Sequence, residues 1–233
     1  MTLGLLLATG CASSPNLHID ARGTTIYDGA VHSPDGVQVF EYTRTSRSEG
    51  DLMVSTHRSR EVDGGREVTL QSATHTPAYA LERSVEHHDQ LGVQSEVVVH
   101  GDRIAMTTVR NGRVRTARRK LSAPPVVGPT LFGFVLRHWD ELARGKTVPI
   151  RFVVPERRRT YAFDLHMSER GADTTTVVMQ AKSAFVRASV PTMRMVFDSA
   201  SKQIRRYEGR IPPRLNGKPV DAQVDYTMHA PFR

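Results

Sequence analysis

The chain has 233 residues and a mass of 26.0 kDa, with 39% hydrophobic, 24% charged and 6% aromatic residues. This composition and a mean hydropathy of −0.38 are typical of a single folded domain, and they exclude a polytopic membrane protein, a collagen-like chain and a largely disordered chain. A formal net charge of +8 and a pI near 10.0 favour polyanionic surroundings, such as nucleic acid, anionic lipid headgroups or acidic envelope polymers.

The amino-terminal segment reads MTLGLLLATGCASSP, and no charged side chain precedes Asp20. Its apolar run is too short to span a bilayer as a helix. The segment Ala8-Thr9-Gly10-Cys11 resembles a bacterial lipobox, in which small residues precede a cysteine that becomes lipidated. This resemblance implies a lipoprotein signal peptide over residues 1–11, a membrane anchor at Cys11 and an outer-membrane lipoprotein that faces the periplasm. The alternative is that Cys11, the sole cysteine, is an ordinary small buried residue.

The segment from residue 12 to residue 36 is rich in Asp, Gly, Ser and Pro, which predicts a tether with room for one short strand. A single β-rich domain is expected from residue 37 to residue 233. Its first part has β-branched and aromatic segments separated by turn signals, which is typical of an antiparallel meander. The expected strands are 37–45, 51–60, 67–72, 79–87, 93–100 and 103–109. Asn111-Gly112 predicts a type I′ hairpin turn.

The segment 129–143 carries apolar residues at three- and four-residue spacing and the only tryptophan. This spacing predicts one amphipathic helix over about residues 129–144, buried against a sheet. Alternating patterns then predict strands over 148–154 and 161–167, followed by strands over 174–187, 193–198, 203–209 and 220–228. The predicted fold is therefore mainly β (α+β), an antiparallel curved sheet or open β-barrel with one central helix.

Motifs for catalysis and for metal or nucleotide binding are absent from the sequence. It contains no HExxH or His-x-His motif, no G-x-S-x-G elbow, no GxGxxG and no Walker A motif. His87 and His88 are adjacent, but neighbouring side chains on a strand point to opposite faces, so they are not expected to share an ion. We therefore expect no metal and no cofactor, and a noncatalytic protein is favoured over a hydrolase of unidentified substrate.

Positive charge is concentrated between residues 113 and 159, a segment that contains twelve Lys and Arg residues and only three acidic residues. The densest groups are Arg118-Arg119-Lys120 and Arg157-Arg158-Arg159. We expect these groups to approach each other and to contact anionic headgroups or an anionic envelope polymer. Nucleic acid is disfavoured because no aromatic residues are interleaved with the arginines. The alternative is a solvated basic rim.

Large apolar side chains on the expected strands and helix could converge on one concave face and hold an apolar ligand. They are Trp139, Phe152, Phe163, Met193 and Met195. The alternative is an ordinary filled core.

The segment from Gly128 to Leu165 contains Trp139-Asp140-Glu141-Leu142 before Gly145, and then Val154-Pro155. It resembles uncharacterised β-rich bacterial envelope proteins. The predicted architecture is also similar to that of the periplasmic lipoprotein carriers, in which a curved sheet closed by helices holds acyl chains. The resemblance implies a noncatalytic envelope lipoprotein that binds a lipid-like ligand. An envelope interaction protein with a filled core and a hydrolase remain as alternatives, and the ligand and the oligomeric state stay open.

Overall fold

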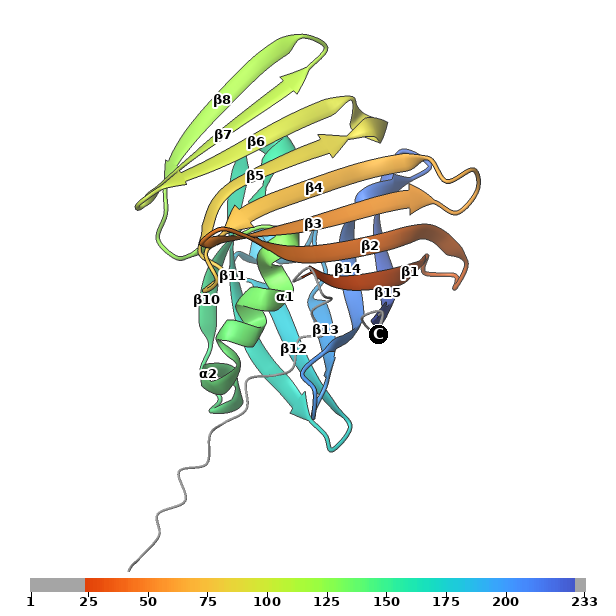
Figure 1. Ribbon diagram of the computed structural model, residues 1–233, viewed down its shortest axis with the longest axis vertical. Coiled ribbons are helices and arrows are strands. Elements are labelled where there is room, and N and C mark those ends of the chain that lie inside the picture. Colours follow the sequence, from red (N-terminus) through yellow and green to blue (C-terminus); the bar gives the residue numbers. More distant parts are fainter. Residues whose placement is uncertain (1–23, 229–233) are drawn as a thin grey trace, which may run out of the picture.

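The computed structural model describes residues 24–228, and their strands form one continuous sheet of fifteen strands (Figure 1). The strand order is β8-β7-β6-β5-β4-β3-β2-β1-β15-β14-β13-β12-β11-β10-β9. Every neighbouring pair is antiparallel except β9 and β10, which are parallel. The strands are β1 Thr24–His32, β2 Gln38–Glu49, β3 Leu52–Glu61, β4 Glu67–His75, β5 Leu81–His88, β6 Val93–His100, β7 Arg103–Arg110, β8 Arg113–Lys120, β9 Pro125–Val126, β10 Val148–Val154, β11 Arg159–Arg170, β12 Thr174–Ala181, β13 Met193–Asp198, β14 Ile204–Leu215 and β15 Lys218–Met228.

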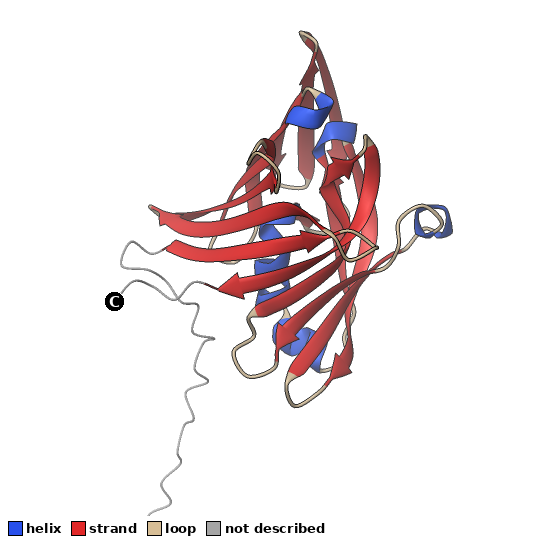
Figure 2. Cartoon of the chain, turned by 90° about the vertical axis from the view of Figure 1, so that its right-hand side faces the viewer, coloured by secondary structure: helices blue, strands red, loops and turns tan. Residues whose placement is uncertain are grey.

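The sheet curls strongly but does not close, because β8 and β9 remain its two edges. Strand β1 lies at its centre and pairs with β2 on one side and β15 on the other. The two halves of the chain thus form the two arms of one sheet, which face each other in Figure 2. The predicted fold class, a mainly β protein with a curved open sheet, is confirmed.

The expected single helix is two helices, α1 Gly128–Arg137 and α2 Trp139–Ala143, separated by His138. A third short helix, α3 Ala184–Arg187, interrupts the segment predicted as a strand over 174–187. Two 3-10 turns, η1 Asp89–Leu91 and η2 Pro155–Arg157, complete the elements. The threonine side chain at position 130 bonds back to the Val127 amide and carbonyl at 3.2 and 3.1 Å, which closes the first turn of α1.

Helix α1 lies between the two arms of the sheet (Figure 1). Its residues from Pro129 to Val135 are all buried, as expected of a helix that is covered on every side. The Phe132 ring meets the rings of Tyr226 and Phe197 edge-on, at centroid distances of 5.5 and 6.4 Å. The α1 backbone at Pro129 accepts a 3.4 Å hydrogen bond from Arg44 on β2. The helix therefore fills the space enclosed by the curl.

The two arms also touch directly, beyond the helix. His88 Nε2 lies 3.0 Å from the carbonyl of Pro212, and the Gln90 side chain forms two hydrogen bonds with the backbone of Arg214. These contacts tie β5 and η1 to β14. Strands β6, β7 and β8 follow β5 in the sheet and lie beyond these contacts between the arms. The hairpin formed by β7 and β8 therefore projects from the end of the molecule (Figure 1).

The folded part of the chain begins earlier than the sequence pattern indicated. Strand β1, Thr24–His32, lies within the segment 12–36, which was expected to be a tether with room for one short strand, and it is paired on both edges. The predicted type I′ turn is confirmed, since Asn111 and Gly112 have φ values of 49° and 70°. Among the residues 24–228, no helix is both long enough and apolar enough to cross a membrane.

Candidate functional site

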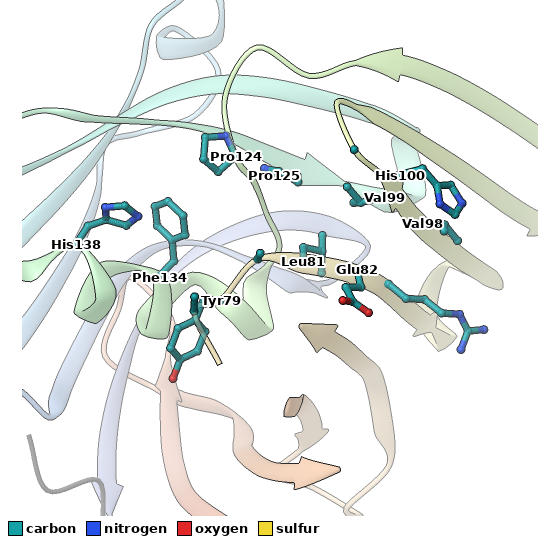
Figure 3. A pocket seen from close by; sticks show the side chains of 14 residues that line it. Tyr79, Leu81, Glu82, Val98, Val99, His100, Pro124, Pro125, Phe134 and His138 are labelled. Atoms are coloured by element: carbon teal, nitrogen blue, oxygen red, sulfur yellow. The ribbon is translucent and has the colours of Figure 1, made fainter. Parts of the chain in front are cut away.

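A surface pocket with a volume of about 770 Å³ lies where the β4–β5 loop crosses α1 and where β6 ends (Figure 3). Phe134 and His138 at the end of α1 form one wall, and β5 and β6 form the opposite wall. Pro124 and Pro125, which follow β8, border it on a third side. The pocket is therefore built by segments far apart in sequence.

Tyr79 positions the β4–β5 loop on the helix. Its backbone has φ 61°, and its amide donates to the Thr76 carbonyl at 2.9 Å. The Tyr79 ring stacks on His75 with centroids 4.8 Å apart and lies against α1 at Gly133. Because Gly133 has no side chain, the tyrosine ring can sit directly on the helix backbone. This contact fixes one wall of the pocket.

The pocket is lined by both apolar and polar side chains. Leu81, Val98, Val99 and Phe134 contribute apolar surface. The polar groups are Glu82, Arg83, His100 and His138. Mixed linings of this kind bind ligands that have an apolar body and a few polar groups.

Two of these polar groups already have protein partners. Arg83 Nε donates to Glu96 at 2.8 Å, and His138 Nδ1 lies 2.9 Å from Glu141 Oε1. The His138 side chain lowers the pKa of the Glu141 carboxyl through their hydrogen bond. The pocket lining contains no Ser, Thr or Cys that could serve with His138 as a nucleophile.

The hairpin formed by β7 and β8, residues 103–120, follows the pocket strand β6 in the sheet and is called the basic hairpin below. It contains seven Lys and Arg residues and neither Asp nor Glu. Lys120 forms an exposed ion pair with Asp102 at 3.4 Å. Within the described chain, the other six basic residues of the hairpin form no ion pair, whereas many arginines elsewhere in the sheet pair with acids at close range. The positive charge of the protein is therefore least neutralised here.

Cross-strand register relates the basic hairpin to the pocket. Val99 on β6 faces Ile104 on β7, which faces Arg119 on β8. Cross-strand partners share one face of a sheet, so Arg119 lies on the same face as the pocket residue Val99. The turn between β6 and β7, which contributes Gly101 to the pocket, accepts a 2.7 Å hydrogen bond at the Asp102 carbonyl from the Leu121 amide, just after β8. A cationic strand end thus lies beside the pocket mouth.

A second group of polar side chains crosses the interior face of the sheet from β2 to β7. Each member is the cross-strand partner of the next, and each is at most 8% exposed. This polar row consists of Arg44, His57, Gln71, Glu86, Ser95 and Thr108.

Only some atoms of the polar row have protein partners. The Tyr42 hydroxyl bonds to His57 Nδ1, Gln71 Nε2 donates to Glu86 Oε1 at 3.0 Å, and Arg158 donates to Thr108 at 2.5 Å. Five buried atoms have no protein partner among the described residues: Arg44 Nε, His57 Nε2, Gln71 Oε1, Glu86 Oε2 and Ser95 Oγ. Buried polar atoms of this kind commonly bond to internal water. The row therefore forms a buried polar seam on the interior face of the sheet.

Burial sets the charge state of this seam. It raises the pKa of Glu86 to about 8, with a further contribution from the nearby Glu156 carboxylate and an opposing one from Gln71. Burial also lowers the pKa of His57 well below its usual value, and the Arg44 cation adds to this effect. Near neutral pH, Glu86 is protonated and His57 is neutral. Arg44 is thus the only full charge in the buried part of the row.

The residues expected to hold an apolar ligand do converge, but in a packed core. Trp139, Phe163, Met193 and Met195 are at most 8% exposed, and Phe152 packs against them at the margin. The Trp139 ring meets Phe197 edge-on at 5.4 Å. Helices α1 and α2, the second of which carries Trp139, pack against the strand residues of this group.

The two basic groups meet the same hairpin at different points. Arg118, Arg119 and Lys120 lie at the end of β8 beside the pocket, whereas Arg157, Arg158 and Arg159 surround the β10–β11 turn. That turn packs on β6 and β7, where Arg158 bonds to Thr108 opposite Arg115. Arg119 pairs with Ile104 on β7, which is four residues before Thr108. The two basic groups therefore contact the hairpin at positions about 13 Å apart along the strand.

Other expectations concern histidines, metals and the anchor. His87 is exposed and His88 is buried, so they lie on opposite faces as expected. Within residues 24–228 no cluster of three or more His, Cys, Asp or Glu side chains is arranged to bind a metal. Cys11 lies outside the described residues.

Sequence reasoning did not find the pocket or the polar row. The pocket depends on Tyr79 meeting Gly133 across the interior, which leaves no local pattern. The polar row had a weak signal, because β3, β4 and β5 carry polar residues on both faces.

Comparison with known proteins gives similarity in structure but not in sequence. No protein-family model and no curated protein matches this chain. A β-barrel-like protein of the domain of unknown function DUF1849 from Brucella abortus is 7% identical, with a TM-score of 0.46 over 88% of this chain and 97% of that one. A presumed exported protein with a YmcC-like fold from Bacteroides fragilis is 8% identical, with a TM-score of 0.29 over 90% of this chain and 96% of that one. The function must be argued from the residues of this chain.

Proposed function

We propose that this protein is a noncatalytic cell-envelope protein that binds an amphipathic anionic ligand. The observation that carries the proposal is the position of the partly apolar pocket beside the basic hairpin. The apolar part of the ligand enters the pocket, and its anionic group lies at the mouth near Arg119. A lipid or another acyl-bearing envelope molecule has this chemistry.

The size and lining of the pocket support an apolar ligand segment. A volume of about 770 Å³ falls within the range of small-molecule sites. The valine and phenylalanine side chains of the walls can take an acyl chain without leaving a polar group unpaired. Glu82 is the one acid in the lining, and it is exposed, as are Arg83 and His100.

The anionic group is recognised by charge rather than by a fixed cage. Arg118, Arg119 and Lys120 are exposed at the end of β8, and the two arginines have no acidic partner in the described chain. Exposed cations attract anionic lipid surfaces by roughly 1 kcal/mol each, and salt weakens this attraction. Arg157, Arg158 and Arg159 extend the positive surface toward the far end of the hairpin.

The pocket replaces the apolar face as the proposed binding place. Trp139 belongs to α2, and it is buried in one core cluster with Phe163, Met193 and Met195, so a ligand could reach these side chains only by displacing the helices. The filled core favours the second candidate function, an envelope interaction protein that uses its surface alone. The two candidates differ in whether the pocket is used.

The location in the cell is proposed from the sequence. A lipidated Cys11 after a signal peptide would anchor the domain to the outer membrane, facing the periplasm, and a di- or triacylated cysteine is sufficient for stable anchoring. Mass spectrometry of the intact protein from a bacterial envelope tests this. A diacylglyceryl mass on an amino-terminal Cys11 supports the anchor, and an unmodified amino terminus contradicts it.

Ligand binding is tested with a fluorescent long-chain fatty acid as the probe. We expect saturable binding that is weakened by Val99→Glu, which places a carboxylate in the pocket, and by Arg119→Gln. The matched controls are Val109→Glu on β7, outside the pocket lining, and Arg60→Gln on β3, and both should bind like the unmodified protein. Native mass spectrometry after gentle purification gives the second readout. Equal binding by Val99→Glu and Val109→Glu would contradict the proposal and favour the interaction protein.

A further inference from the structure

Strand β8 is an unpaired edge of the sheet and is exposed on both of its faces. Its single strand partner is β7, and all its residues are exposed except the half-buried Ala117. In Figure 1 it forms the outer margin of the basic hairpin. A free edge presents a row of backbone donors and acceptors that can pair with another strand.

The register identifies which backbone groups face outward. In a two-residue type I′ hairpin the flanking residues, Arg110 and Arg113, exchange both of their backbone hydrogen bonds. Further along the strands, hydrogen-bonded pairs then alternate with pairs that are not hydrogen-bonded. The Leu121 amide bonds to the Asp102 carbonyl, which agrees with this alternation at the other end. Odd-numbered residues of β8 therefore bond to β7. The outward backbone groups belong to Val114, Thr116, Arg118 and Lys120.

One of these groups has a surface partner. The Arg118 carbonyl accepts a 2.9 Å hydrogen bond from the Arg119 guanidinium. This bond is exposed, so an incoming backbone amide can replace it. Val114 and Thr116 leave the centre of the edge open, and Val114 is a large apolar residue that is 65% exposed.

The charges of β8 lie on both faces of the strand. Arg113, Arg115 and Arg119 share the face of the buried residues of β7, and Arg118 and Lys120 lie on the other face. A flat membrane can meet one face at a time. A strand that pairs edge-on projects its own side chains over both faces, so acidic side chains on it can neutralise both sets.

Other occupants fit the edge less well. A second copy of this chain would bring arginine opposite arginine, and like charges directly opposite each other destabilise a strand pair. Nucleic acid bound as a single strand is recognised by stacking on aromatic rings, and residues 103–120 contain none.

We propose that β8 is a docking edge for an extended acidic polypeptide, which adds to the sheet as a further antiparallel or parallel strand. Backbone hydrogen bonds to Val114, Thr116 and Arg118 provide the register. The arginines on both faces select a segment with Asp or Glu on both faces. This interaction does not involve the pocket lining, but it shares Arg118, Arg119 and Lys120 with the anionic group of the proposed ligand.

The test uses the full chain and a fluorescent peptide of about twelve residues, made of Glu-Glu-Thr-Val repeats, which places Glu on both faces. Binding is followed by fluorescence anisotropy. Thr116→Pro removes one outward amide without removing a bond to β7, and Thr116→Ala is its control. We expect Thr116→Pro to weaken binding by at least about tenfold, and Thr116→Ala to change it by less than about twofold.

Charge is tested separately from backbone pairing. Arg115→Glu with Arg118→Glu should abolish peptide binding, whereas Lys146→Glu with Lys218→Glu changes net charge equally at exposed positions elsewhere and should preserve most of it. A peptide of the same sequence with N-methylated backbone amides should bind at least about tenfold more weakly.

Equal binding of the methylated peptide, or full binding by Thr116→Pro, would overturn strand addition. Binding of anionic phosphatidylglycerol vesicles in place of the peptide would instead assign the hairpin to membranes. Val99→Glu should leave peptide binding unchanged, which separates this test from that of the pocket.

Discussion

Tyr79 lies so close to Gly133 that a methyl group on the glycine would sit 1.8 Å from Cε1 of the tyrosine ring. The ring is held there by its stacking on His75 and by the positive φ of Tyr79 in the β4–β5 loop. The contact joins that loop to α1 and shapes the pocket.

Gly133→Ala should therefore destabilise the protein, although alanine favours a helix over glycine by about 1 kcal/mol. We expect the free energy of unfolding to fall by about 1–3 kcal/mol, because the Tyr79 ring must leave its site. In a Tyr79→Ala background the same substitution should become neutral or stabilising. Urea unfolding of the four proteins measures this, and a stabilising effect in the native background would show that the ring moves at no cost.

Gln90 joins the two arms of the sheet. Its side chain donates to the Arg214 carbonyl at 2.9 Å and accepts from the Arg214 amide at 2.8 Å. Gln90→Ala should cost about 1–3 kcal/mol, because both bonds are lost. It should also speed amide exchange at the end of β14. Gln94→Ala, at an exposed position of β6, is the control and should change neither quantity.

Glu86 should make stability depend on pH. Its pKa is raised from 4.5 to about 8 by burial and by Glu156, so the folded state keeps a proton that the unfolded state loses. Stability from this group is complete below pH 4.5, falls as the pH rises toward 8, and then levels off.

Glu86→Gln removes this dependence while keeping the shape of the side chain. Near pH 4.5 the free energy of unfolding of the variant should equal that of the unmodified protein. At pH 8 or above it should be higher than that of the unmodified protein, by a difference on the order of 4 kcal/mol. Glu82→Gln, an exposed carboxyl on the same strand, serves as the control. Denaturant titrations from pH 4.5 to 9 give the comparison. If the difference between Glu86→Gln and the unmodified protein stays flat, Glu86 is ionised in the folded state.

Periodicity predicted much of the fold because most strands have one buried and one exposed face. Strand β13 has the predicted bounds, and β10 matches the alternation of Val148 to Val154. Strand β8 was not predicted, because arginines on both faces of an edge strand give no alternation of apolar residues. Room for one short strand was predicted in the segment of β1, but its Asp and Gly residues resemble those of a linker and gave neither the bounds of β1 nor its central place in the sheet.

The candidate site was predicted less well than the fold, for physical reasons. Trp139 and Met195 were expected together and do lie together, but the sequence could not show that α1 fills the space beside them. The polar row was not predicted because the residue type of His57 or Gln71 does not indicate whether its side chain is buried or exposed. Only the curl of the sheet places these side chains inside.

Arg44 is a buried cation without a carboxylate partner in the described chain, and this makes a last test of the polar row. It is 6% exposed, donates one 3.4 Å hydrogen bond to Pro129, and lies 5.1 Å from the Phe132 ring centroid and 5.7 Å from that of Tyr27. Because desolvating an unpaired charge costs more than these contacts return, Arg44→Met should keep the packing and raise the unfolding free energy by about 1–2 kcal/mol. Arg44→Lys should be less stable than either, since an ammonium is a strongly hydrated point charge that stacks poorly on rings. Thermal and urea unfolding of the three proteins at one pH gives the order. If Arg44→Met were instead destabilised by more than about 1 kcal/mol, the arginine would have to be stabilised by a partner inside the seam, and an anion bound next to Arg44 would be the first to seek.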